Sequence, residues 1–97
     1  MSAYVIADVQ VTDPAAYELY RPLAAASIAR FGGRFIVRGG KVELLEGAAE
    51  PQRMVVIEFA DAEAARRWYR SEEYQKALKI RQSASTQARL ILVEGAD

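Results

Sequence analysis

Cysteine, histidine and asparagine are all absent from this chain of 97 residues. The lack of cysteine excludes disulfide bonds, thiol catalysis and zinc–thiolate sites. The lack of histidine removes the commonest transition-metal ligand, the usual haem ligand and the usual general base. We therefore expect no metal and no cofactor. Any chemistry must use carboxylates, tyrosines, arginines, hydroxyls and backbone groups.

Neither sign of charge is in excess, because thirteen basic and thirteen acidic residues cancel. Nucleic-acid binding normally requires a basic face, so we expect no nucleic-acid partner. No apolar run approaches the ~20 residues of a membrane-spanning helix, and residues 1–4 do not resemble the start of a signal peptide. The sequence therefore predicts a cytoplasmic protein that does not bind a membrane.

The length indicates one domain, residues 1–97, because so few residues cannot build two independent cores. Hydrophobic residues make up 52% of the chain. A small domain buries only part of its apolar surface within itself, so we expect the rest to be covered by a second copy. The homodimer would form through one face of a sheet, the face that carries Ile6, Ile36, Met54 and Val56.

Residues 48 positions apart match each other in the two halves of the chain. Asp13 corresponds to Asp61 (61 − 13 = 48), and Glu46-Gly47 corresponds to Glu94-Gly95. Each half reads as an apolar run, an aspartate at a helix start, the helix and a second apolar run. Two such halves predict a ferredoxin-like α+β fold, β-α-β-β-α-β, with a four-stranded antiparallel sheet and two helices on one face.

The pattern of apolar residues and breakers places these elements along the chain. Strands are expected over 4–11, 34–38, 53–59 and 86–94, and helical segments over 14–31 and 61–83. Ser71 is expected to interrupt the second helix and to cap a new segment. After the break at Gly39-Gly40, residues 41–46 either continue the second strand or pair locally, and residues 47–52 form a loop.

One segment of the second half carries a family resemblance. The run Trp68-Tyr69-Arg70-Ser71-Glu72-Glu73-Tyr74, followed by Arg81, resembles the bacterial family catalogued as domain of unknown function 1330. That family falls within the dimeric α/β-barrel superfamily. The resemblance covers nearly the whole chain, and it implies a monomer that dimerises sheet to sheet with its helices outside. It implies no activity.

The superfamily also includes cofactor-free monooxygenases, lactone isomerases and haem-degrading enzymes. Several of these depend on histidine or asparagine, which this chain lacks. The resemblance therefore does not carry their chemistry over to this chain.

Arg81 is the first candidate site residue. At helical spacing it shares a stripe with Tyr74, Ala77 and Leu78, so an arginine points toward the core. A buried guanidinium needs a partner. Either it forms an ion pair with Glu58 or Asp8, or it binds the carboxylate of a ligand between helix and sheet.

The second candidate is a group of charged residues on the mixed face of the sheet, Asp8, Arg38 and Glu58. Side-chain alternation predicts that the three share a face on neighbouring strands. If they are close, Arg38 would hold one carboxylate ionised, and this ionised pair would raise the pKa of the other carboxylate, which makes Glu58 the candidate general base. Alternatively, the three form an ion network inside the dimer interface.

The third candidate is a set of aromatic residues on the two helices: Tyr17, Tyr20, Trp68, Tyr69 and Tyr74. Aromatic residues at helical spacing usually fill a core. Polar tips among apolar walls are also typical of a small-molecule site, and tyrosine hydroxyls near Arg81 could supply them.

Two hypotheses about function follow from these patterns. In the first, the protein binds a small anionic or aromatic-acid molecule between helices and sheet. Whether it also carries out cofactor-free acid–base chemistry through Glu58 and a tyrosine is left open. In the second, it is a non-catalytic dimer whose buried charges serve only packing. Whether the protein is an enzyme stays open at this point.

Overall fold

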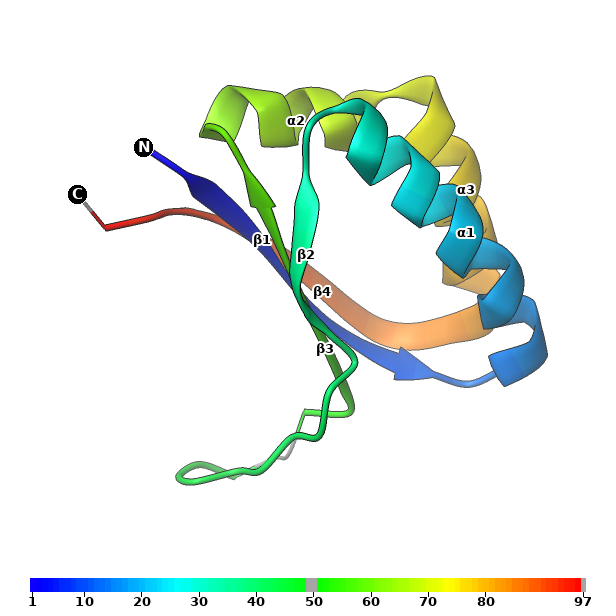
Figure 1. The fold of residues 1–97 in the computed structure, drawn as a ribbon. Helices are drawn as coiled ribbons and strands as arrows, with labels where there is room; N and C mark the ends of the chain where they lie inside the picture. Colours follow the sequence, from blue (N-terminus) through cyan, green and yellow to red (C-terminus); the bar gives the residue numbers. More distant parts are fainter. Residues whose placement is uncertain (49–50, 97) are drawn as a thin grey trace.

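The structure is a computed structural model that describes residues 1–48 and 51–96. Its elements follow in the order β1 (Ala3–Val11), α1 (Pro14–Arg30), β2 (Arg34–Arg38), β3 (Arg53–Phe59), α2 (Ala62–Arg70), α3 (Glu72–Ala84) and β4 (Ser85–Glu94). The four strands form one antiparallel sheet in the order β2-β3-β1-β4. All three helices lie on one face of this sheet (Figure 1). The predicted ferredoxin-like α+β fold is confirmed.

The helix starts show why the two halves of the sequence resemble each other. Asp13 accepts a hydrogen bond from the backbone N of Ala16 at 3.2 Å, and Asp61 accepts one from Ala64 at 2.8 Å. Such capping satisfies backbone N–H groups that a helix leaves unpaired. Ser71 caps α3 in the same way, so the second helical unit is divided there, as predicted.

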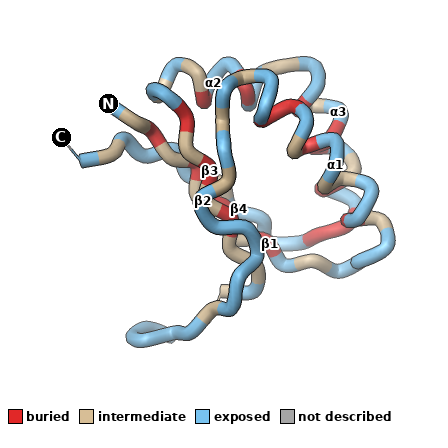
Figure 2. The backbone as a smooth tube through the Cα atoms, in the orientation of Figure 1, coloured by how far each residue is buried: buried red, intermediate tan, exposed pale blue. Residues whose placement is uncertain are grey.

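The core lies between the helices and the face of the sheet that they cover, which we call the helix side. In β1 the side chains that point to this side are buried and those between them are less so, as strand alternation requires. The helices bury Tyr17, Ile28, Trp68 and Tyr74 against it. Buried segments accordingly lie along the inner surfaces of both layers (Figure 2). The opposite face of the sheet, the open face, has no helix over it (Figure 1).

The first half of the repeat departs from the predicted pattern after β2. Residues 41–46 form no strand, whereas their equivalents in the second half belong to β4. Gly39 has a φ of +67°, a conformation that glycine adopts readily, and its N donates to the carbonyl of Met54 at 2.8 Å. Beyond this contact the chain extends away from the sheet (Figure 1). The predicted loop 47–52 includes residues 49–50, which lie outside the described residues.

A register shift in β2 corrects one predicted grouping. The pairing of β2 with β3 shifts between residues 35 and 37, and Arg38 therefore lies opposite Val55, which is buried on the helix side. The prediction that Arg38 shares a face with Asp8 and Glu58 is wrong. A bulge places one extra residue in a strand, so every later side chain changes face.

None of the helices in the described part of the chain is both long enough and apolar enough to cross a membrane.

Candidate functional site

Arg81 lies on α3 and points with the buried stripe of this helix toward the sheet. It is 6% exposed, and its neighbours on the stripe, Tyr74, Ala77 and Leu78, are buried as well. Its Nε is buried and has no hydrogen-bond partner among the described residues. The expected pairing of Arg81 with Glu58 or Asp8 is absent from the ion pairs of the described chain.

A cleft of about 450 Å³ opens beside Arg81, between α2 and the edge strand β4. We call it the outer cleft. It is lined by Val5, Ala65, Arg66, Trp68, Tyr69, Arg70, Arg81, Ala88, Leu90, Ile91 and Leu92. The walls are largely apolar, and the charged residues that line the cleft in the described part of the chain are three arginines. The cleft therefore suits an anion with an apolar body.

The cleft exists because the helices do not fully cover β4. In the register of β1 with β4, Leu92 lies opposite Val5, which is on the helix side. Leu92 is nevertheless 36% exposed, whereas Val5 is 5% exposed. At the mouth, Arg66 contacts Glu63 on its own helix at 3.5 Å, with both side chains largely in solvent. Arg66 and Arg70 thus lie where an approaching anion would pass.

A second, smaller cavity of about 40 Å³ lies deeper between the helices and the sheet. We call it the inner cavity. Trp68, Arg81 and Leu90 line both it and the outer cleft. The remaining lining residues are Ala7, Val9, Tyr17, Tyr20, Arg21, Ala24, Ile28, Phe35, Arg38, Arg53, Val55 and Ile57. None of the described acidic residues lines either space.

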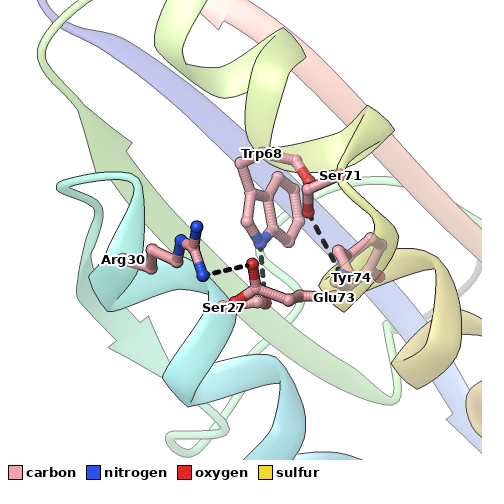
Figure 3. Close-up of polar contacts among 6 residues, drawn as sticks. All are labelled: Ser27, Arg30, Trp68, Ser71, Glu73 and Tyr74. Carbon is pink, nitrogen blue, oxygen red and sulfur yellow. Dashed lines mark hydrogen bonds and ion pairs between the residues drawn. The ribbon is translucent and has the colours of Figure 1, made fainter.

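The aromatic residues pack against one another, and their polar atoms bond mainly within the set. The hydroxyls of Tyr20 and Tyr74 are 2.9 Å apart, and burial raises the pKa of Tyr20 above its ordinary value. Trp68 and Tyr74 pack with ring centroids 4.2 Å apart. Trp68 donates its Nε1–H to the hydroxyl of Ser27 at 3.0 Å (Figure 3). Tyr69 also packs against Trp68 and Tyr74, with ring centroids 6.1 and 5.6 Å away, but it is 42% exposed and lines the outer cleft.

The bonds in Figure 3 also tie the helices together around Trp68. Ser71 caps α3 by accepting from the backbone N of Tyr74 at 3.1 Å, and Arg30 of α1 contacts Glu73 of α3 at 2.9 Å. The indole ring that lines both spaces is therefore held by residues of α1, α2 and α3 together.

Glu58 lies on the open face, away from both spaces. Arg34, opposite Glu58 in the β2–β3 register, donates to it at 2.7 Å, and the Tyr4 hydroxyl donates at 3.3 Å. The hydrogen bond from Arg34 is the main cause that lowers the pKa of Glu58, with a further contribution from Ser2. Glu58 is therefore an ionised, hydrogen-bonded carboxylate.

The structure separates the three charged residues that were predicted to meet. Asp8 lies on the open face, opposite Arg89 of β4 and Met54 of β3. Arg38 lies on the helix side, with its guanidinium carbon 4.1 Å from the centre of the Phe35 ring. Within the described residues, no three acidic side chains gather closely enough to hold a metal ion.

Sequence reasoning missed Arg53, which lines the inner cavity and whose buried Nε has no hydrogen-bond partner within the described chain. A signal was present, because Arg53 precedes Val55 and Ile57 by two and four residues in β3. Strand alternation puts all three on the same face, toward the helices. Arg34 was also missed as the partner of Glu58, although the antiparallel pairing of β2 with β3 places the start of β2 beside the end of β3.

The fold and the cavities define a ferredoxin-like α+β domain with a cleft between its helices and its sheet. The chain belongs to the family described as Domain of unknown function (DUF1330), which matches residues 2–96. Comparison with curated proteins gives no match.

Solved structures share the fold at low sequence identity. A protein of unknown function from Rhodopseudomonas palustris has a TM-score of 0.83 at 22% identity, covering 99% of this chain and 83% of that one. SnoaB, a cofactor-independent oxygenase from Streptomyces nogalater, has a TM-score of 0.67 at 21% identity, with 99% and 94% covered. A dimeric ferredoxin-like protein of unknown function from a Jannaschia species has a TM-score of 0.73 at 10% identity, with 98% and 100% covered.

Proposed function

We propose that this protein is a homodimer that binds a small organic acid in the outer cleft, with Arg81 as the residue that binds its carboxylate. The observation that carries this proposal is the state of Arg81. It is 6% exposed, and among the described residues its Nε has no partner and no acidic side chain lines the cleft. A ligand carboxylate would supply the missing acceptor.

The energetics favour a ligand over a purely structural role. A buried donor without an acceptor costs about 1–3 kcal/mol, and more if the group is charged. A core arginine with a protein partner recovers part of this cost, but Arg81 has no such ion pair among the described residues. Residues kept at a cost to stability are commonly functional.

The cleft indicates which acids fit. A volume of about 450 Å³ falls within the range of ordinary small-molecule sites, roughly 300–1,000 Å³. Leu90 and Leu92 provide apolar walls on the β4 side, and Trp68 and Tyr69 provide aromatic surface on the α2 side. This lining favours an aromatic or branched aliphatic body over a highly polar one.

The dimer is proposed to form through the open face of the sheet. Ile6 lies opposite Val56 on one side and Ile91 on the other, and Ile91 and Val93 are 39% and 43% exposed. Contiguous apolar surface of this kind usually marks an interface. Two solved structures with this fold, one of them the Jannaschia protein, are described as dimeric.

In this arrangement Glu58 would belong to the dimer interface and not to the cleft. Its carboxylate on the open face is held by Arg34 and Tyr4. Cofactor-free chemistry would need a titratable group beside the ligand. In the inner cavity the candidate is Tyr20, whose pKa is raised by burial, so it is a poor base near neutral pH. We therefore propose binding, and not catalysis, although SnoaB, which shares the fold, is a cofactor-independent oxygenase.

The test is a screen of aliphatic and aromatic monocarboxylates, with benzoate as the reference, followed by titration calorimetry. Three proteins are compared: the wild type, Arg81→Met, and Arg67→Met as a control. Arg67 lines neither space, so its replacement changes net charge equally without touching the site.

We expect at least one carboxylate to bind the wild type and the control alike, and Arg81→Met to bind it at least about tenfold more weakly. If no carboxylate binds at millimolar concentration, or if Arg81→Met binds as well as the wild type, the proposal is wrong.

A further inference from the structure

We infer that the inner cavity receives the acidic head of the ligand, that Arg53 binds this head together with Arg81, and that the preferred head is a doubly charged oxyanion such as a phosphate monoester. This inference rests on the proposed function, because it places the body of the same ligand in the outer cleft.

The first observation concerns hydrogen bonding. In the part of the chain that the structure describes, two buried side-chain nitrogens or oxygens have no partner, the Nε atoms of Arg53 and Arg81. Both residues line the inner cavity. Buried polar groups in folded proteins are nearly always satisfied, so two exceptions at one cavity indicate a shared missing acceptor.

The second observation is that the side chain of Arg53 is held in place. Its guanidinium carbon lies 5.5 Å from the centre of the Tyr17 ring, within the range of a cation–π contact. The backbone of Gly39 passes directly over the guanidinium, where any Cβ would collide with it. A fixed guanidinium loses less entropy on binding an anion than a mobile one does.

The third observation is the charge around the cavity. Arg21 and Arg38 also line it, but Arg21 contacts Glu18 at 2.9 Å and Arg38 lies over Phe35. Arg38, Arg53 and Arg81 have no ion-pair partner among the described residues, and of these three Arg53 and Arg81 have a buried Nε without a hydrogen bond. Two guanidinium groups bind a doubly charged oxyanion more strongly than a singly charged one.

The size of the cavity agrees with this assignment. A volume of about 40 Å³ is roughly three times the ~10–15 Å³ that a cavity needs to hold one water molecule. The space thus admits a group of a few heavy atoms, such as a small oxyanion, and is too small for a ring. Since Trp68, Arg81 and Leu90 line both spaces, a head in the inner cavity can be continuous with a body in the outer cleft.

The experiment compares two probes with the same ring, benzoate and phenyl phosphate, by titration calorimetry. Measurements are made at about pH 8, above the second phosphate pKa of about 6, so that phenyl phosphate is doubly charged. The salt concentration is held at about 0.15 M to screen long-range charge effects. The proteins are the wild type, Arg53→Met, Arg81→Met, and the control Arg67→Met.

We expect the wild type and the control to bind phenyl phosphate at least about tenfold more tightly than benzoate. Arg53→Met should abolish most of this preference while still binding benzoate. Equal affinity of the wild type for both probes would overturn the inference, as would a preference that survives in Arg53→Met. Either result would leave Arg81-dependent binding of benzoate, and with it the proposed function, intact.

Failure of the proposed function gives a different result, namely that Arg81→Met binds both probes as the wild type does. Gly39→Ala provides a second test that keeps both charges, because the added Cβ must displace the Arg53 guanidinium. We expect it to weaken phenyl phosphate binding more than benzoate binding. An unchanged preference in Gly39→Ala, with its fold verified by circular dichroism, would count against the assigned position of Arg53.

Discussion

Replacement of Arg81 by methionine should raise the thermal stability of the ligand-free protein. Arg81 is 6% exposed, and its Nε has no acceptor in the described chain. Methionine keeps most of the aliphatic stem that packs beside Tyr74 and Leu78, and it adapts to irregular spaces. The substitution therefore removes a buried, unpaired donor and loses little packing.

The magnitude follows from the cost of that donor. A buried unsatisfied group costs about 1–3 kcal/mol. In a domain of about 100 residues, each 1 kcal/mol shifts the melting midpoint by roughly 4–8 °C. The expected result is therefore a rise of at least about 4 °C in the Tm of Arg81→Met.

The assay is differential scanning calorimetry of both proteins after extensive dialysis, at equal chain concentration because dimerisation makes Tm concentration-dependent. Addition of a carboxylate that binds should then raise the Tm of the wild type alone. A fall of more than about 4 °C for ligand-free Arg81→Met would refute the reasoning, because it would correspond to about 1 kcal/mol of lost structural interaction. A lost buried ion-pair partner would cost still more, about 3–5 kcal/mol.

Three further predictions concern the open face and the helix layer. Glu58→Gln should lose less stability than the wild type when the pH is lowered, as measured by urea unfolding at successive pH values. The pKa of Glu58 is lowered in the folded protein, so its contribution to stability is present above the ordinary pKa of 4.5 and disappears as the pH falls through the folded-state pKa. Ser27→Ala should lower Tm by at least about 4 °C, because the Trp68 Nε1–H loses its buried acceptor at a cost of about 1–3 kcal/mol; an unchanged Tm would show that the bond contributes nothing. Ile91→Lys should shift the protein from dimer to monomer in analytical ultracentrifugation, and a dimer that persists would place the interface elsewhere than the open face.

Much of the fold could be predicted because its signals are local. The aspartates at 13 and 61 cap their helices through bonds to residues three positions later, so sequence spacing is sufficient to find them. Ser71 is a third case of the same kind. The strand 53–59 has the bounds that its sequence predicts, and from Met54 to Phe59 its residues alternate between partly buried and buried.

The errors arose where a structure depends on a partner that the sequence does not reveal. Residues 41–46 resemble a strand, but a strand must form backbone hydrogen bonds with a neighbouring strand. In the described chain the last such bond from this segment to β3 is the one that the Gly39 N donates to the Met54 carbonyl. The face on which Arg38 lies depends on a single bulge, which changes side-chain alternation without any composition cue. The grouping of Arg38 with Glu58 failed for that reason, and Arg34 took the expected place.

The backbone of the sheet lies between two carboxylates of the open face and the two arginines whose Nε atoms have no partner among the described residues. Glu58 and Asp8 lie on the open face, whereas Arg53 and Arg81 lie on the helix side. The intervening layer of backbone prevents hydrogen bonds between the two groups, because such bonds require heavy atoms within about 3 Å of each other. The net charge of zero gives no sign of this arrangement, because it sums all charges of the chain without regard to their positions. The space between helices and sheet is thus positive, so an anion from outside the described chain is the acceptor that would complete it.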